Sequence, residues 1–120
     1  MKTYGYPLSR WNAAKEEARQ AVIAVAKAQT TICYSDLVQE ITSIKFQAHD
    51  FILFHLLGQV STEESQAGRG MLTAVVVRIE DGRPGEGFFD LARELGYDSS
   101  DGDAFWVAEL NKVHSTWKSE

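Results

Sequence analysis

Residues 71 to 79, Met-Leu-Thr-Ala-Val-Val-Val-Arg-Ile, are the stretch that decides the fold. The run is rich in β-branched residues and almost continuously apolar, which is typical of a strand covered on both faces. Asp81-Gly82 follows it at once, and this dipeptide favours a turn. We therefore predict a central strand over residues 71–79, and the flanking sequence determines what packs around it.

Upstream of this strand, the spacing of apolar residues predicts three helices. The first has Ser9 as its N-cap and carries apolar residues at helical spacing from Trp11 to Val25. The second covers about 35–42 and directly follows a short β-branched strand at 30–34. The third covers 51–60, where nearly unbroken apolar character predicts a helix buried on most sides.

Two details of the third helix carry further expectations. Gly58 disfavours a helix interior relative to alanine, so we expect it to permit the close approach of a neighbouring element. Ser61-Thr62-Glu63-Glu64 has the spacing of a capping box, which predicts a restart of the helix or a bend at that point.

Two helices are predicted after the strand. Residues 88–95 have apolar side chains at i, i+3, i+4 and i+7, and Gly96 is the expected stop. A final helix, capped by Ser100 or Asp103, places Trp106 and Trp117 on one stripe. The sequence thus predicts a single domain over residues 1–120, of the α+β class, mainly helical, with a small two- or three-stranded sheet and a winged-helix-like layout.

Bulk composition narrows the class of protein. The chain has 120 residues, 44% of them hydrophobic, and one cysteine, Cys33. A single cysteine excludes an internal disulfide and a cysteine-rich zinc site, and favours a reducing compartment. No apolar run approaches the roughly 20 residues that span a bilayer, and no secretory signal is recognisable. We expect a cytoplasmic protein with no membrane partner.

The net charge of −5 is concentrated in one block. Residues 80–109 hold nine acidic residues and two arginines, which gives −7, whereas residues 1–79 and 110–120 each contribute +1. Nucleic acid binding needs clustered Lys and Arg, so the acidic block is poorly suited to it. The block predicts instead either an exposed solvated face or a surface that docks a basic protein.

Three strings of sequence resemble a family of short bacterial proteins to which no activity is attached. They are Gly68-Arg-Gly-Met-Leu-Thr-Ala-Val-Val-Val77, Pro84-Gly-Glu-Gly-Phe-Phe89 and Phe105-Trp106. The similarity extends from about residue 30 to 117. It implies family membership and no particular chemistry.

The layout of the chain is also similar to the winged-helix domain of DNA alkyltransferases. The likeness rests on residues 31–38, a helical region, and a strand that ends in Asp81-Gly82. That family's reactive Pro-Cys-His-Arg motif would fall where this chain has Gly70-Met-Leu-Thr73. Alkyl transfer is therefore excluded, and the resemblance implies only a related fold.

Candidate binding residues come from the acidic block and from the glycine-rich loop before residue 71. Arg69 can grip an anion or a partner carboxylate bidentately, or close onto the acidic block as a structural residue. Glu86 lies within the glycine-rich loop at 82–87, which is only a weak candidate for binding anions because Glu86 would repel phosphate. The remaining candidates are the acids Asp98, Asp101 and Asp103, together with Trp106 as either a core residue or an interface anchor.

The residue types do not assemble into a recognisable catalytic or metal site. Cys33 lies between apolar neighbours, which favours packing over nucleophilic catalysis. His49 and His55 are six residues apart, whereas a helical zinc pair needs a spacing of four. We expect no metal and no cofactor. A hydrolase or nuclease that uses His49 or His55 with Glu64 and Arg69 stays open as an alternative.

Three functions are therefore carried forward. The first is a non-enzymatic interaction or regulatory module whose acidic surface docks a basic protein partner, with a homodimer as a further possibility. The second is a winged-helix regulator that reads DNA through the predicted helix at 35–42 or through the first helix, although the helix at 35–42 contains Asp36 and Glu40 and no Lys or Arg. The third is the small hydrolase or nuclease built on His55, Glu64 and Arg69.

Overall fold

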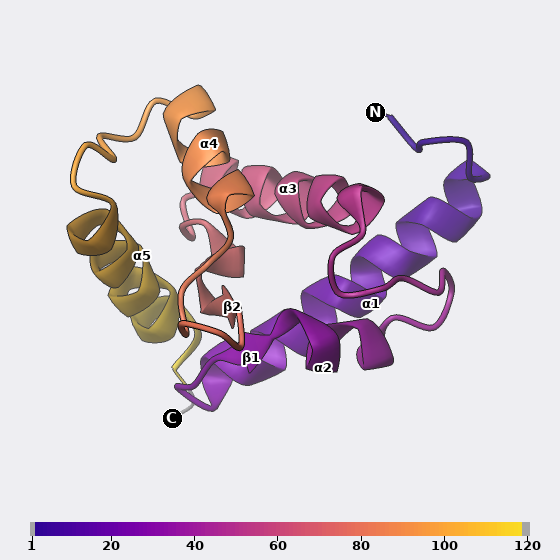
Figure 1. The fold of residues 1–120 in the computed structure, drawn as a ribbon, viewed down its shortest axis with the longest axis horizontal. Helices are drawn as coiled ribbons and strands as arrows, with labels where there is room; N and C mark the ends of the chain where they lie inside the picture. Colours follow the sequence, from indigo (N-terminus) through magenta and orange to yellow (C-terminus); the bar gives the residue numbers. More distant parts are fainter. Residues whose placement is uncertain (1, 119–120) are drawn as a thin grey trace.

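The computed structural model describes residues 2–118 and is a mainly helical α+β structure with one small sheet (Figure 1). Its elements in chain order are α1 (Leu8–Lys27), β1 (Ile32–Cys33), α2 (Tyr34–Glu40), α3 (Phe51–Gln66), the 3₁₀ helix η1 (Leu72–Val75), β2 (Val76–Val77), α4 (Glu86–Glu94) and α5 (Gly102–Trp117). The two strands pair in parallel, with Ile32 opposite Val76 and Cys33 opposite Val77. The α+β expectation is confirmed, and the sheet has two strands.

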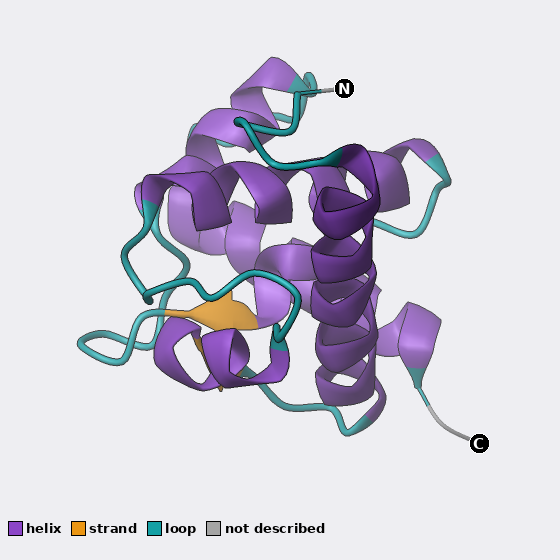
Figure 2. Ribbon diagram, turned by 90° about the vertical axis from the view of Figure 1, so that its right-hand side faces the viewer, coloured by secondary structure: helices purple, strands orange, loops and turns teal. Residues whose placement is uncertain are grey.

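The core lies where η1 is enclosed by α1, α3 and α5, and Figure 2 shows the short sheet, in orange, among the surrounding helices. Helix α1 contributes Trp11, Ala14, Ala18 and Val22, all fully buried, at the predicted helical spacing. The predicted N-cap is wrong, because α1 begins at Leu8 after Pro7 and no side chain caps it.

The predicted strand over 71–79 is the main correction. Residues 72–75 form a 3₁₀ helix, and only Val76 and Val77 are strand. The backbone N–H groups at the start of this segment donate to side chains and not to a neighbouring strand. Met71 N donates to Glu109 Oε2 at 2.9 Å, and Thr73 N donates to Ser61 Oγ at 3.0 Å. All four residues of η1 are buried, so an apolar run that resembles a strand is accommodated as a helical turn.

Of three further predictions, those for α3 and α5 are wrong and that for the end of α4 is confirmed. Helix α3 runs without interruption to Gln66, because Ser61 is buried and bonds to Thr73 and so does not act as a cap. Helix α5 is capped by Asp101, whose Oδ1 accepts from Ala104 N at 3.1 Å, and not by Ser100 or Asp103. Helix α4 ends before Gly96, which has a φ of +88° and confirms the predicted stop.

Candidate functional site

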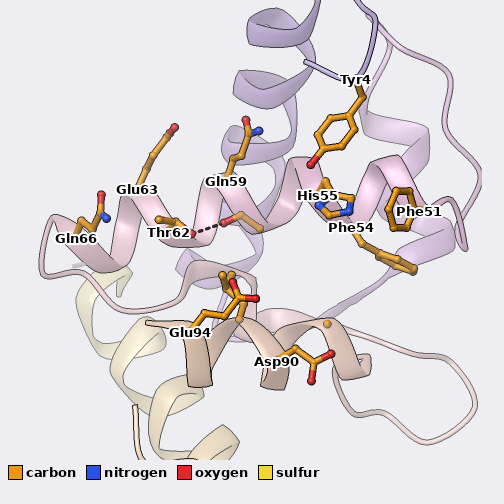
Figure 3. Close-up of a pocket in the computed structure, with 13 residues that line it drawn as sticks. Tyr4, Phe51, Phe54, His55, Gln59, Thr62, Glu63, Gln66, Asp90 and Glu94 are labelled. Atoms are coloured by element: carbon orange, nitrogen blue, oxygen red, sulfur yellow. Dashed lines mark hydrogen bonds between the residues drawn. The ribbon is translucent and has the colours of Figure 1, made fainter. Parts of the chain in front are cut away.

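A groove between α3 and α4 is the largest by volume of the surface hollows that we compare among residues 2–118 (Figure 3). We call it the α3–α4 groove; its volume is about 790 Å³. Helix α3 contributes one long wall, α4 the other, and Tyr4 closes one end. Its lining residues are Tyr4, Phe51, Phe54, His55, Gly58, Gln59, Thr62, Glu63, Gln66, Gly87, Asp90, Leu91 and Glu94.

Aromatic side chains dominate one end of the α3–α4 groove. Phe51 is 68% exposed and Phe54 is 41% exposed, although both belong to the helix that was predicted to be buried on most sides. Neighbouring rings hold them in place. The His55 ring lies edge-on to Phe51 at 4.3 Å and stacks on Tyr4 at 4.8 Å, while Phe54 meets the Tyr34 ring edge-on at 5.5 Å. The exposed rings therefore form a supported apolar surface.

A second, more enclosed hollow opens from the groove beside Phe54, and we call it the inner hollow. Its volume is about 300 Å³. Its apolar walls come from the three helices α2, α3 and α4 and consist of Tyr34, Phe54, Leu57, Phe88 and Leu91. The Tyr34 hydroxyl accepts a hydrogen bond from Gly85 N at 3.2 Å. Burial raises the pKa of Tyr34, so its hydroxyl is uncharged at neutral pH.

Carboxylates from α4 border both hollows. Asp90 and Glu94 line the α3–α4 groove, and Glu86 lines the inner hollow. Figure 3 shows Glu94 on the side of α4 that faces α3, whereas Glu63 extends from α3 away from α4. Among residues 2–118, Arg78 is the one Lys or Arg that lines either hollow, and it is already paired with Asp81 at 2.5 Å. The lining of these two hollows is therefore apolar with an acidic border.

An ionic cluster joins α3 to α1 on the side of α3 away from α4, and one of its members, Glu63, also lines the edge of the α3–α4 groove. Glu64 is 2% exposed; it accepts two hydrogen bonds from Arg69, at 2.9 and 2.7 Å, and one from Arg19 at 2.9 Å. Glu63 accepts from Lys15 at 2.6 Å and also pairs with Arg19. We call Lys15, Arg19, Glu63, Glu64 and Arg69 the ionic cluster.

The cluster lowers the pKa of both glutamates. For Glu64 the hydrogen bonds from Arg69 are the main cause, and they outweigh the opposing effect of burial. For Glu63 burial is the largest single effect and acts in the opposite direction, but the hydrogen bonds and positive charges of Lys15 and Arg19 together exceed it, so its pKa is also lowered. Both side chains are thus held as carboxylates at neutral pH.

The predicted acidic candidates are largely engaged in local contacts. Asp101 caps α5, Asp98 accepts from Ser100 at 2.8 Å, and Asp103 pairs with Arg83. Hydrogen bonds from Ser100 lower the pKa of Asp98. Trp106 is partly buried and its Nε1 donates to Ala74 O at 2.9 Å, which ties α5 to η1. Glu86, the remaining acidic candidate, is exposed and lines the inner hollow.

The structure does not bring His55, Glu64 and Arg69 into one cleft. Arg69 and Glu64 do pair, but His55 precedes Glu64 by nine residues on α3, which places the two on opposite sides of the helix. His55 lines the α3–α4 groove, whereas neither Glu64 nor Arg69 does. Sequence reasoning did not identify the partnership of Glu63 and Glu64 with α1, because the partners are more than 40 residues apart in the chain.

The other reactive residue types lie apart from this groove. Cys33 Sγ is 3.2 Å from Ser35 Oγ and 3.3 Å from Asp36 Oδ2, in a shallow hollow that His49 also lines. His114 Nε2 is 3.0 Å from Thr30 O. Within residues 2–118, no three His, Cys, Asp or Glu side chains are grouped so that they could hold a metal ion.

Comparison of the chain with known protein families, with curated proteins and with solved structures gave no match. No helix within residues 2–118 combines the length and apolar character needed to cross a membrane. The fold and the groove define a small α+β protein with an exposed, acid-bordered aromatic groove.

Proposed function

We propose that this protein is a non-enzymatic interaction module whose α3–α4 groove docks a basic, partly apolar segment of a partner protein. The observation that carries the proposal is the presence of Phe51 and Phe54, both exposed, beside the α4 carboxylates Asp90 and Glu94. This narrows the expected docking surface from the whole acidic block at 80–109 to the groove that Asp90 and Glu94 line.

The apolar part of the groove supports a protein partner. Exposed large aromatic residues that gather in a concave site are typical of interaction surfaces, and aromatic anchors dominate binding energy at such surfaces. Phe51 packs against His55, which itself stacks on Tyr4, and Phe54 packs against Tyr34. Binding would therefore order few side chains.

The charge of the groove supports a basic occupant. Asp90 and Glu94 are exposed, and of the two only Asp90 has a recorded ion pair within residues 2–118, with Arg93. A Lys or Arg of the partner would be attracted to this border and would also raise the rate of association. A second copy of this chain carries the same net charge of −5, so a homodimer through this face is disfavoured.

The two alternative functions have less support. The winged-helix likeness is kept as a proposal about fold, supported by α2 and α3 following one another with β1 and β2 beside them. Neither α2 nor α3 contains a Lys or Arg, so DNA recognition through them lacks phosphate contacts. The hydrolase alternative lacks convergence of His55 with Glu64 and Arg69. The free Cys33 supports a reducing, cytoplasmic location as part of the proposal.

The test uses the full chain as bait for a phage-displayed library of random 16-residue peptides. Affinities of the enriched peptides are then measured for the wild type, for the groove variant Asp90→Asn/Glu94→Gln, and for the matched variant Asp98→Asn/Asp103→Asn. We expect enriched peptides with net positive charge that bind the groove variant about 10-fold more weakly at low salt, with less than about a twofold change for the matched variant.

Three results would overturn the proposal. One is the absence of any enriched peptide. Another is loss of affinity only in Asp98→Asn/Asp103→Asn, which would return the docking surface to the loop at 98–103. The third is a concentration-dependent dimer in sedimentation that the substitutions at Asp90 and Glu94 alter, which would make the groove an interface between copies of this chain.

A further inference from the structure

The inner hollow has the size and lining of a pocket for a single large side chain. Its volume of about 300 Å³ lies at the lower limit for small-molecule sites, and it is the more enclosed of the two hollows around Phe54. Leu57 and Phe88 on its walls are nearly fully buried, so its shape is fixed by the core. It also opens onto the α3–α4 groove, where the proposed partner segment would lie.

Four residues line both the hollow and the groove and form the passage between them, and two of these four residues are glycines. Gly58 of α3 and Gly87 of α4 line both spaces. A Cβ added at Gly87 would meet no atom within 4 Å, and one added at Gly58 would touch only Leu91 Cδ2 at 3.8 Å. There is therefore open space beside Gly87, and an added Cβ at Gly58 would make only an ordinary van der Waals contact, so the passage has room for a larger side chain at Gly87.

The polar groups of the hollow favour an apolar side chain with a basic neighbour. The Thr73 hydroxyl is bonded to Ser61, and the Tyr34 hydroxyl accepts from Gly85 N. Arg78 is paired with Asp81. Glu86 is exposed and lines the hollow, and no ion pair within residues 2–118 involves it, although its charge contributes to the raised pKa of Arg78. An apolar group inside the hollow leaves these bonds intact, and a cation beside it meets Glu86.

We infer that the inner hollow takes one Leu, Phe or Trp side chain of the partner segment, with a Lys or Arg next to that residue paired to Glu86. This inference rests on the proposed docking function and adds to it the residue that anchors the partner. Such an anchor, enclosed by Tyr34, Phe54, Leu57, Phe88 and Leu91, is expected to carry a large share of the affinity.

The test combines a substitution in the passage with substitutions in the probe. The probe is the tightest peptide from the selection described above, together with variants in which each large apolar residue is replaced in turn by Ala. The protein variants are Gly87→Leu, which places a side chain in the passage, and Gly87→Ala, which adds the same gain in helix propensity without filling the passage. Gly87→Gln is a second variant that places a long side chain in the passage. Thermal unfolding of each variant checks that it is folded.

We expect Gly87→Leu to weaken the probe at least about 10-fold and Gly87→Ala to change it by less than about twofold. Replacing one particular apolar residue of the probe with Ala should weaken its binding to the wild type by a similar factor. The same replacement should weaken binding to Gly87→Leu only slightly further, which is the coupling expected of two groups that share one pocket. A Glu86→Gln variant should weaken the probe only when the neighbouring Lys or Arg of the peptide is present.

The outcomes separate the two proposals. If peptides bind and depend on Asp90 and Glu94, but no apolar position is coupled to Gly87→Leu, the anchor inference is wrong and the docking function stands. If Gly87→Leu and Gly87→Gln both leave the affinity unchanged, the inference is also overturned. If no peptide binds the wild type, both proposals fail together.

Discussion

The two sides of helix α3 differ in what their side chains contact. On the side toward α1, Glu63 and Glu64 pair with three basic residues of the same chain. On the side toward α4, Phe51 and Phe54 are exposed and the acids of α4 border them. The carboxylates on the first side are paired with basic residues of the same chain, whereas the aromatic rings on the second side are only partly covered by other side chains.

This difference assigns separate roles to the two sides. A buried carboxylate with three hydrogen bonds from arginines is costly to disturb, so the ionic cluster holds α1, α3 and the loop at 67–70 together. Exposed rings contribute little to folding but are available to bind. Substitutions on the two sides should therefore separate loss of stability from loss of docking.

The largest expected effect is that of Glu64→Ala on stability. Removal of the carboxylate leaves Arg19 and Arg69 without their shared buried partner, and breaking a buried pair in this way costs about 3 kcal/mol of unfolding free energy. Urea unfolding measures the change. Glu16→Ala is the matched control, because its carboxylate is exposed and pairs with Arg19 at 3.4 Å, so its loss should cost about 0.5 kcal/mol or less. Equal losses of unfolding free energy in the two variants would show that the ionic cluster stabilises the fold no more than an exposed ion pair does.

Low pH should reduce the stability that the ionic cluster contributes. The pKa values of Glu63 and Glu64 are lowered from their ordinary value of 4.5 in the folded chain, so the unfolded chain binds more protons as the pH falls. The stability that the cluster contributes is present above pH 4.5 and is lost as the pH decreases through the folded pKa values. Unfolding free energies measured downward from pH 6 should decline, and the slope should be shallower in Glu64→Ala. Some slope will persist in that variant, because hydrogen bonds from Ser43 and Thr42 also lower the pKa of Glu17. An unchanged slope in Glu64→Ala would contradict the assignment.

The sequence predicted the helices well because their signals are local. Apolar spacing located α1, α3, α4 and α5 to within a few residues, and Gly96 marked the end of α4. The strand over 71–79 was wrong because burial on all sides produces the same apolar run in a strand and in a 3₁₀ turn. What selects the turn is distant in the chain, since Glu109 accepts the Met71 N–H across 38 residues.

The candidate site shows the same division between local and distant information. Glu86 was identified from the acidic block and does line a hollow, and the Arg69–Glu64 pair lies within one short segment. Phe51 and Phe54 were expected in the core, because an apolar helix gives no sign of which side lacks a cover. The salt bridge of Lys15 to Glu63 was not predicted either, since the two residues are 48 positions apart in the chain.

The smallest expected effect is a gain in stability for Gly58→Ala. This substitution tests how closely side chains pack on the side of α3 that faces α4. Gly58 was expected to permit close approach of another element, but the nearest atom to an added Cβ is Leu91 Cδ2 at 3.8 Å, which is ordinary contact. Alanine in a helix interior is favoured over glycine by about 0.8–1.0 kcal/mol, so unfolding free energy should rise by about that amount. Thermal and urea unfolding measure it, and Gly70→Ala is the contrasting variant: Gly70 has a φ of +85° and an added Cβ would lie 3.3 Å from Glu109 Oε2. We expect Gly70→Ala to destabilise the chain, because both its backbone conformation and its surroundings disfavour a side chain. A loss of stability in Gly58→Ala would mean that Leu91 lies closer to position 58 than the 3.8 Å between an added Cβ and Leu91 Cδ2. The passage into the inner hollow would then be narrower than the anchor inference requires.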